Sequence, residues 1–152
     1  MATILVVDAN PLERRVVRMT LEGEGHRLAE AADAARALEI LNTVTCDIVL
    51  LAMDASEVDG FNLIAKVHAI PGREGTHFIA VLDSSDEKGP IESFINGARD
   101  LLIRPFGAPE LRLAIDRVMA PESIDLRDRL VGIQLEAYEM AVRLQEQART
   151  GE

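Results

Sequence analysis

The sequence predicts a doubly wound α/β fold built on a five-stranded parallel sheet, and two features carry this prediction. Five apolar segments rich in Ile, Leu and Val are short and continuous rather than alternating, which is typical of strands covered on both faces. Five helical patterns alternate with them, as the right-handed crossovers of a parallel sheet require. The predicted strands are 3–7, 26–31, 47–53, 77–82 and 100–105, and the predicted helices are 10–22, 33–42, 59–70, 89–97 and 107–119.

Capping residues mark the ends of the predicted helices. Asn10 can accept hydrogen bonds from the first turn of the helix that follows it, and Pro11 occupies the first helical position, where no backbone N–H is needed. Asp33 plays the same capping part for the second helix. Gly23 and Pro71 mark the points where the first and third helices stop.

The composition is that of a globular protein that does not bind nucleic acid. Of the 152 residues, 48% are hydrophobic and 28% are charged, which suits one packed domain with a short extension. The formal net charge of −10 argues against nucleic-acid binding, because that affinity comes from Lys and Arg at phosphates. Arg14, Arg15 and Arg18 are interpreted as a solvated helix face shared with Glu13 rather than as a phosphate-binding patch.

Nothing in the sequence indicates a membrane or an oxidising compartment. The chain enters a strand directly after Met1, and no apolar run approaches the ~18 residues of a membrane span. Cys46 is the only cysteine, so no internal disulfide can form, and its place beside an apolar strand favours a core residue over a nucleophile. We therefore expect a cytoplasmic protein with no membrane partner.

The chain is predicted to divide at "APES" (120–123) into a domain of residues 1–120 and a helical extension of residues 121–152. In the extension, apolar residues recur at alternating spacings of four and three, which is a heptad pattern of about three repeats. Its members are Leu126, Leu130, Ile133, Ala137, Met140 and Leu144. The pattern favours a helix that pairs with a second copy of the chain in a homodimer, or a linker helix; the alternative is a sixth helix folded back on its own domain.

A site is expected at the carboxyl ends of the predicted strands, because ligands of doubly wound sheets bind there. The motifs at those ends resemble the receiver domain of two-component response regulators, the CheY-like family. The resemblance covers about residues 3–119 and keeps the order and spacing of four segments: "ILVVDANPLERRVVRMTLEGEGH", "VDGF", "INGARDLLIRPF" and "PEL".

The resemblance implies transfer of a phosphoryl group from a histidine kinase to an aspartate at the end of the third strand. In the family, two acids after the first strand hold Mg²⁺, a hydroxyl after the fourth strand donates to the phosphoryl group, and a lysine after the fifth neutralises it. Here the acceptor position is Ala52, the two acid positions are Asp8 and Ala9, the hydroxyl position is Leu82 and the lysine position is Arg104. These departures predict a degenerate pseudo-receiver that lacks the phosphoacceptor aspartate, with no catalytic residue, no metal and no other cofactor.

The acids near this pocket allow two arrangements. Arg104 is expected to reach Asp8 or Asp54 and to close the vacant pocket with a bidentate pair. Alternatively, Asp8, Asp54 and Asp83 could form a substitute cation site, with Asp54 as a substitute acceptor, although a reacting carboxylate must be placed very precisely.

A protein-binding face is implied over the fourth helix, fifth strand and fifth helix, which is the family's usual contact surface. Its members here are Ile95, Arg99, Leu101, Phe106 and Arg112. The fifth-strand residue that moves on activation in the family is Tyr or Phe, and here it is Leu101. The aromatic half of the family's switch is therefore absent as well.

Together these features predict a phosphorylation-independent signalling module that acts by protein–protein interaction in a two-component-type pathway and is not an enzyme. Its expected partner is a kinase, a phosphotransferase or an output protein. Two alternatives stay open: the regulatory N-terminal part of a larger response regulator with a cyclic-di-GMP enzyme or a kinase as output, and a Mg²⁺-dependent phosphoacceptor that uses the displaced acids.

Overall fold

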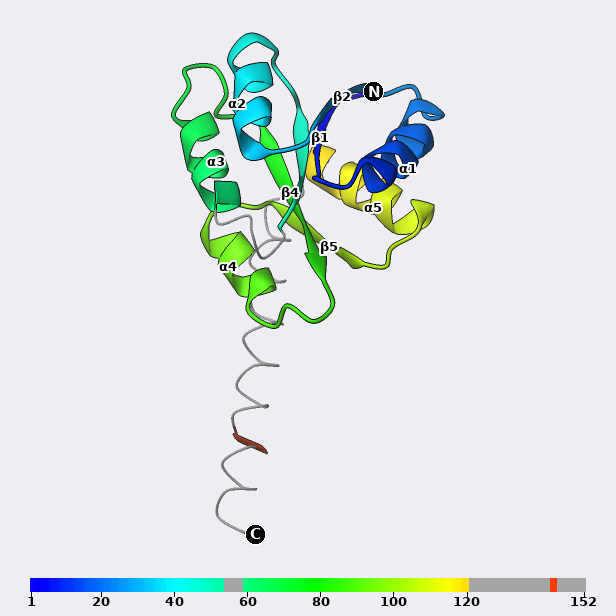
Figure 1. Ribbon diagram of the computed structural model, residues 1–152, viewed down its shortest axis with the longest axis vertical. Coiled ribbons are helices and arrows are strands. Elements are labelled where there is room, and N and C mark those ends of the chain that lie inside the picture. Colours follow the sequence, from blue (N-terminus) through cyan, green and yellow to red (C-terminus); the bar gives the residue numbers. More distant parts are fainter. Residues whose placement is uncertain (54–58, 121–142, 145–152) are drawn as a thin grey trace.

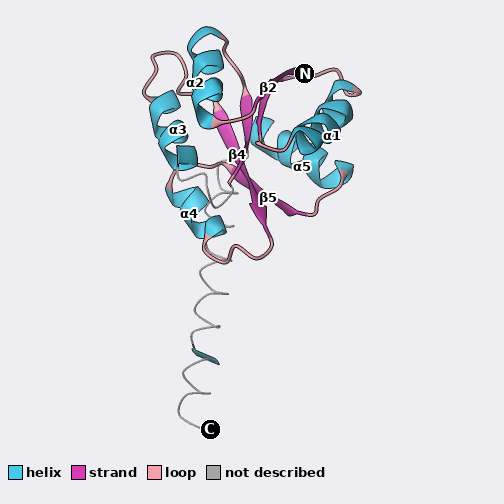
Figure 2. Cartoon of the chain, viewed as in Figure 1, coloured by secondary structure: helices cyan, strands magenta, loops and turns pink. Residues whose placement is uncertain are grey.

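The computed structural model describes residues 1–53, 59–120 and 143–144, and between residues 1 and 120 five strands alternate with five helices (Figures 1 and 2). The elements are β1 (Thr3–Val7), α1 (Pro11–Glu22), β2 (Arg27–Ala31), α2 (Ala34–Thr43), β3 (Ile48–Ala52), α3 (Asp59–His68), β4 (His77–Asp83), α4 (Gly89–Ile95), β5 (Asp100–Arg104) and α5 (Ala108–Met119).

The five strands form one parallel sheet in the order β2-β1-β3-β4-β5, so the predicted doubly wound fold is confirmed. Helices α1 and α5 lie on one face of this sheet, and α2, α3 and α4 lie on the other (Figure 1). The chain runs from β1 outward to β2 and returns past β1 to β3, so the crossovers change direction between β1 and β3. In such sheets the crevice for a ligand opens at the carboxyl ends of these two strands.

The continuous apolar runs are explained by burial on both faces of the sheet. Along β1, Ile4 and Val6 pack into the cluster beneath α1 and α5, whereas Leu5 and Val7 pack into the cluster beneath α2 and α3. Successive side chains of a strand point to opposite faces, so the four residues of β1 from Ile4 to Val7 are all apolar. Each large side chain buried in this way contributes roughly 1.5–3 kcal/mol.

The predicted helix caps of α1 and α2 are confirmed. The Asn10 side chain accepts hydrogen bonds from the backbone N–H of Leu12 at 2.9 Å and of Glu13 at 3.4 Å. The Asp33 side chain accepts from the N–H of Arg36 at 2.8 Å. Each cap of this kind stabilises its helix by about 1 kcal/mol.

Two helices end earlier than the sequence predicts, and the backbone gives the reason. Helix α3 stops at His68 instead of residue 70, because the next turn tightens: the N–H of Ile70 donates to the carbonyl of Val67, three residues back, at 3.0 Å. Helix α4 stops at Ile95 instead of residue 97, because Gly97 adopts a φ of +110°.

Cys46 lies in the cluster beneath α2 and α3 and is buried. Burial raises the pKa of its thiol, and the neighbouring Asp47 carboxylate raises it further. A protonated thiol in an apolar cluster is a poor nucleophile. The prediction that Cys46 is a core residue is therefore confirmed.

The C-terminal extension falls mostly outside the described residues. Helix α5 ends before Ala120, whose backbone is extended. The heptad positions Leu126, Leu130, Ile133, Ala137 and Met140 lie outside the described residues, while Leu144 lies in a helix and is 59% exposed. Within the part of the chain that the structure describes, no helix is long and apolar enough to span a bilayer.

Removing the hydroxyl of Ser93 is expected to stabilise the protein. Ser93 lies in α4, is fully buried, and its hydroxyl has no hydrogen-bond partner among the described residues. A buried hydroxyl without a partner costs about 1–3 kcal/mol, so Ser93→Ala should raise the free energy of unfolding in urea by about 1 kcal/mol. The exposed Ser85→Ala serves as the control and should change it little; a loss of stability in Ser93→Ala alone would contradict the assignment.

Candidate functional site

Four residues of the predicted pocket meet at the carboxyl edge of the sheet. Asp8 follows β1, and Ala52, Asp83 and Arg104 are the last residues of β3, β4 and β5. Asp8, Ala52 and Arg104 line one cavity of about 350 Å³ at this edge. The parallel topology therefore brings these predicted site residues together. Asp54 lies outside the described residues.

Arg104 is the centre of a charged group at this edge. Its Nη2 lies 3.1 Å from Oδ2 of Asp8 and 2.9 Å from Oε2 of Glu13. Its Nη1 donates to Oδ1 of Asp83 at 3.2 Å, and the register pairs these two residues across β4 and β5. The predicted contact between Arg104 and Asp8 is thus present. The contact with Asp8 is single rather than bidentate, and among the described residues Arg104 contacts three carboxylates. The alternative pair with Asp54 lies outside the described residues.

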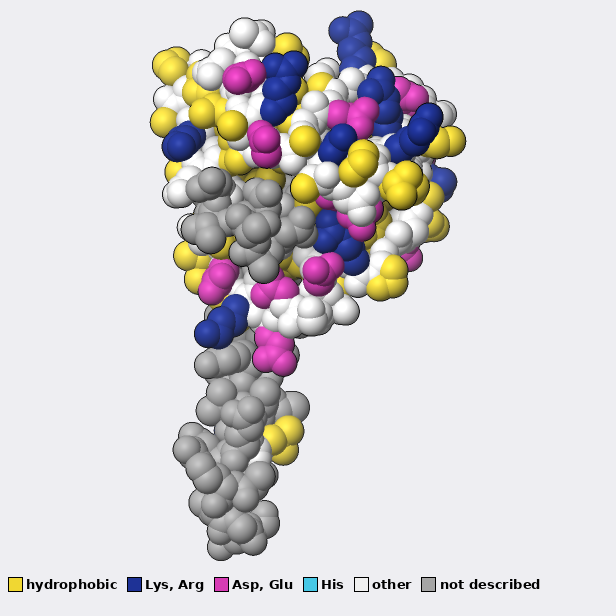
Figure 3. Space-filling view, viewed as in Figure 1, with side chains coloured by type: hydrophobic (Ala, Val, Ile, Leu, Met, Phe, Trp, Pro, Cys, Tyr) yellow, Lys and Arg dark blue, Asp and Glu magenta, His cyan; other side chains and the backbone are white. Residues whose placement is uncertain are grey.

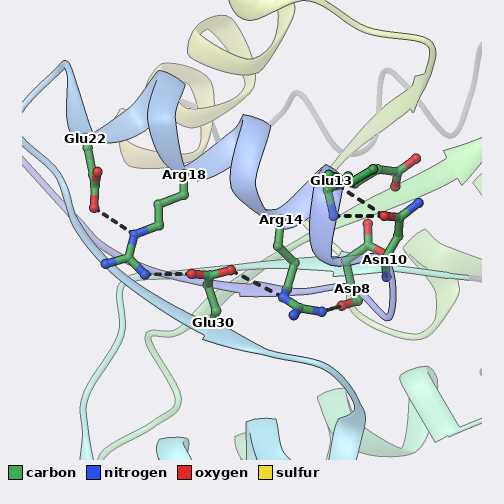
Figure 4. Close-up of polar contacts among 8 residues, drawn as sticks. Asp8, Asn10, Glu13, Arg14, Arg18, Glu22 and Glu30 are labelled. Carbon is green, nitrogen blue, oxygen red and sulfur yellow. Dashed lines mark hydrogen bonds and ion pairs between the residues drawn. The ribbon is translucent and has the colours of Figure 1, made fainter.

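Asp8 is fixed by the backbone as well as by Arg104. Its side chain is largely buried, and Oδ1 accepts a hydrogen bond from the N–H of Asn10 at 2.9 Å. Its own N–H donates to the carbonyl of Ala31 at 3.1 Å, and its carbonyl accepts from the Arg14 guanidinium (Figure 4). The contacts of the Asn10 N–H and of Arg104 with the carboxylate are charge-assisted and offset the cost of removing it from water.

The three departures from the family pattern leave this edge without polar atoms where the resemblance places them. Ala52 is buried and presents only a methyl group to the cavity. Leu82 is buried with Ala80 and Ala98 in a small apolar cluster, against which Leu101 packs. Ala9 is exposed. None of these side chains donates or accepts a hydrogen bond.

Mg²⁺, which the resemblance implies, does not fit these residues. The ion takes carboxylate, carbonyl and water oxygens in a near-octahedral shell. Of the two acid positions and the acceptor position, only Asp8 carries a carboxylate, and its Oδ2 lies 3.1 Å from the Arg104 guanidinium, which repels a divalent cation. Among the described residues, no group of three or more His, Cys, Asp or Glu side chains could hold a metal ion.

Two of the three arginines of α1, Arg14 and Arg18, form ion pairs with β2, which corrects the predicted solvated helix face at those positions, whereas Arg15 is exposed as predicted. The Glu30 carboxylate of β2 lies 3.3 Å from Nε of Arg14 and 2.6 Å from Nη1 of Arg18 (Figure 4). Nε of Arg18 also lies 2.7 Å from Oε1 of Glu22. Helix α1 packs beside β2, and this packing places Glu30 of β2 between Arg14 and Arg18 of α1.

Replacing Glu30 with Gln is expected to remove a pH-dependent part of the stability. The hydrogen bond from Arg18 lowers the pKa of the Glu30 carboxyl below its ordinary value of 4.5, and burial acts in the opposite direction. A carboxyl with a lowered pKa in the folded state stabilises it above the unfolded pKa, and this contribution is lost as the pH falls through the folded pKa. Because Glu30 is partly exposed, we expect a contribution below about 1 kcal/mol.

The measurement is urea unfolding of wild type and Glu30→Gln across this range. The difference in unfolding free energy should be fully present at about pH 7 and should shrink progressively as the pH falls below the ordinary Glu pKa of 4.5. Glu39→Gln, in an exposed ion pair with Arg36 on α2, is the matched control and should show a smaller effect. A Glu30→Gln difference that stays constant down to about pH 3 would show that the loss is one of packing.

The five residues predicted to form one protein-binding face come from α4, β5, α5 and the segments that flank β5, and β5 is the edge strand of the sheet. Ile95, which is 70% exposed, ends α4, and Leu101 packs into the cluster of Leu82 on the α4 side of the sheet. Phe106 packs against the cluster beneath α1 and α5 and lines the cavity. Arg112 forms an ion pair with Glu24, which follows α1. Arg99 lies before β5, at the opposite end of that strand from Phe106.

Two features of the site are not predicted from the sequence. Glu13, which is predicted to share a solvated helix face with the arginines of α1, contacts Arg104. Leu12, Val16 and Met19 are apolar, yet they are 70%, 66% and 68% exposed, and the first two line the cavity. Their spacing of four and three places them on one helix face. The sequence signal for this surface was a second apolar face of α1, in addition to the face that packs into the core.

Comparison with known proteins agrees with the fold and the motifs. The profile of the response regulator receiver domain matches residues 4–116. The transcriptional regulatory protein SrrA of Staphylococcus aureus is 28% identical over 116 residues, which cover 76% of this chain and 47% of SrrA. The chain thus spans about half the length of the curated relatives it matches.

Solved structures with the same fold include receivers from two other bacteria. The chemotaxis response regulator CheY4 of Vibrio cholerae has a TM-score of 0.72 at 24% identity, over 78% of this chain and 99% of that one. The receiver domain of NtrX from Brucella abortus has a TM-score of 0.69 at 27% identity, over 76% of this chain and 97% of that one. With its family profile matched over most of its length, the chain belongs to the response regulator receiver domain family.

Proposed function

We propose that this receiver domain works without phosphorylation, as a protein-binding signalling module in a two-component-type pathway. One observation carries the proposal: at the carboxyl edge of the sheet, the Arg104 cation contacts Asp8, Glu13 and Asp83 beside the buried methyl group of Ala52. The positive charge of Arg104, which would stabilise a bound phosphoryl group, is already matched by carboxylates. The acceptor position is occupied by Ala52, which carries no nucleophile.

A phosphoryl group would also meet an unfavourable charge at this edge. It brings a charge of about −1.5 to −2, and Asp8, Glu13 and Asp83 already outnumber the one guanidinium among them. Stabilisation of a phosphoryl transition state depends on fixed donors and cations. The proposed state is therefore that of a degenerate pseudo-receiver without catalytic activity.

The packing of the residues between the pocket and the outer surface also supports a single conformation of the domain. Leu82, at the hydroxyl position, and Leu101, at the position of the family's moving aromatic residue, pack on the same apolar cluster. Neither side chain has a hydrogen bond to exchange when the pocket changes. A signal through this path would require repacking of the cluster, which we propose does not happen in response to phosphate.

Exposed apolar side chains support a protein partner on the α4 and β5 side. Ile95 is 70% exposed and Ile103 is 40% exposed, and exposed apolar patches are typical of interaction surfaces. The partner would be a kinase, a phosphotransferase or an output protein. We also propose a cytoplasmic homodimer held by the heptad pattern of residues 121–152.

One observation favours a second candidate, in which the chain is the regulatory N-terminal part of a longer regulator. SrrA is named a transcriptional regulatory protein, and the matched region covers only 47% of it. A cyclic-di-GMP enzyme or a kinase would be the output in this second proposal. The third reading, a phosphoacceptor built from displaced acids, is weakened because Asp8 and Asp83 both contact Arg104.

Incubation of the full chain with acetyl phosphate and Mg²⁺, followed by intact-mass spectrometry, tests the proposal. We expect no mass increase, while a receiver that keeps the acceptor aspartate, run as the positive control, gains one phosphoryl group. A stable phosphoryl adduct on this chain, mapped to Asp54 or Asp83, would overturn the proposal in favour of the displaced acids.

A further inference from the structure

The cavity at the carboxyl edge of the sheet has the size and lining of a site for a small organic molecule. Its volume is about 350 Å³, within the range of about 300–1,000 Å³ that is typical of ligand sites. Of the thirteen described residues that line it, ten are apolar: Val6, Val7, Leu12, Val16, Val17, Leu50, Ala52, Val81, Pro105 and Phe106. The other three are Asp8, Glu13 and Arg104, so the polar groups gather at one part of an otherwise apolar wall.

The cavity opens beside α1, where apolar side chains are exposed. Leu12 and Val16 line it and are 70% and 66% exposed. Figure 3 shows hydrophobic side chains on this surface interspersed with acidic and basic ones. Binding of a ligand that covers these exposed apolar side chains is favourable, because it removes apolar surface from water.

The net charge at the mouth of the cavity determines whether a cationic or an anionic ligand is favoured. The charged rim, which we define as Asp8, Glu13, Asp83 and Arg104, contains three carboxylates and one guanidinium. Arg14 touches the Asp8 carbonyl, but its charge is matched by Glu30. A carboxylate accepts about four hydrogen bonds, and among the described residues each oxygen of Asp8 accepts one. The rim therefore attracts a cation and repels an anion.

We propose that this cavity binds an amphiphilic organic monocation, with an alkyl or aromatic body against α1 and Phe106 and an ammonium head at Asp8 and Glu13. The proposal rests on the proposed function in one respect: the same edge of the sheet holds neither Mg²⁺ nor a phosphoryl group. It adds a chemical class of ligand that would occupy the site in their place.

Three probes that differ only in the head group test the sign of the charge. Hexylammonium, hexanol and hexanoate are titrated into the ¹⁵N-labelled full chain, and the amide resonances of Asp8, Val17 and Ala52 are followed. We expect saturable shifts with hexylammonium, a dissociation constant at least about fivefold lower than that of hexanoate, and hexanol in between. Equal or tighter binding of hexanoate, or the absence of saturable shifts with hexylammonium, would overturn the proposal.

Two matched pairs of variants on α1 test the location. Val16→Trp fills the cavity and should weaken hexylammonium binding about tenfold or more, whereas Met19→Trp, on the same exposed helix face but outside the lining, should leave it unchanged. Glu13→Gln should weaken it about threefold, whereas Glu22→Gln should not. Equal loss in Val16→Trp and Met19→Trp would place the probe on the outer face of α1, a surface for a protein partner, and would overturn the cavity site.

The acetyl phosphate experiment separates the two proposals. An unlabelled protein that fails to bind hexylammonium overturns the ligand site and leaves the proposed function intact. A labelled protein overturns the proposed function, and the hexylammonium titration then decides the ligand site separately.

Discussion

The single variant Ala52→Asp is expected to remain almost unlabelled by acetyl phosphate, whereas the triple variant Ala9→Asp, Ala52→Asp, Leu82→Thr is expected to be labelled. The single variant restores a nucleophile, but Ala9 and Leu82 still leave the cation and the phosphoryl oxygen without ligands. Loss of one fixed donor to a developing charge typically costs a factor of about 10²–10³ in rate. The triple variant should therefore be labelled at least about a hundredfold faster, as measured by intact mass against time.

Folding must be checked in both variants, because Ala52 and Leu82 are buried. Urea unfolding of the unlabelled proteins supplies that control. Efficient labelling of the single variant would show that the supporting residues matter less than the geometry indicates. Failure of a folded triple variant would show that Arg104, through its ion pairs with Asp8, Glu13 and Asp83, keeps the pocket closed.

Truncation after Ala120 is expected to convert a homodimer into a folded monomer at micromolar concentration. Among the described residues the buried core runs from Ala2 to Val118, and α5 ends at Met119, so the cut removes none of the core that the structure describes. The heptad positions beyond it would be an apolar stripe, and burying each large member contributes roughly 1.5–3 kcal/mol. Loss of the whole stripe should abolish dimerisation in light scattering.

A pair of double variants separates the heptad seam from the rest of the extension. Leu130→Asp with Met140→Asp lies on the seam and should give a monomer at full length. Val131→Asp with Val142→Asp lies off the seam, carries the same added charge and should stay dimeric. A truncated domain that unfolds would show that the extension packs on its own domain, and one that stays dimeric would move the interface to another surface.

The fold could be predicted because its signals are local. The continuous apolar run of β1 follows from burial on both faces, and the caps at Asn10 and Asp33 lie next to the helices they begin. The ends of α3 and α4 were less well predicted. They depend on how the last turn closes, which composition alone does not determine.

The pocket could be predicted only in part, because its contacts join residues far apart in the chain. Motif spacing located Asp8, Ala52 and Arg104. The contact of Arg104 with Glu13 depends on how α1 packs beside the carboxyl end of β5, and so does the division of Arg104 among three acids.

The central claim is that phosphate does not change the state of this domain, and amide NMR of the full chain tests it most directly. Spectra are recorded with Mg²⁺ alone and with Mg²⁺ plus acetyl phosphate. The account predicts superimposable resonances for Asp8, Ala52 and Leu101, and for Ile95 on the outer surface. Shifts that begin at Asp8 and Ala52 and extend to Leu101 and Ile95 would contradict it, because they would reveal a working phosphate switch.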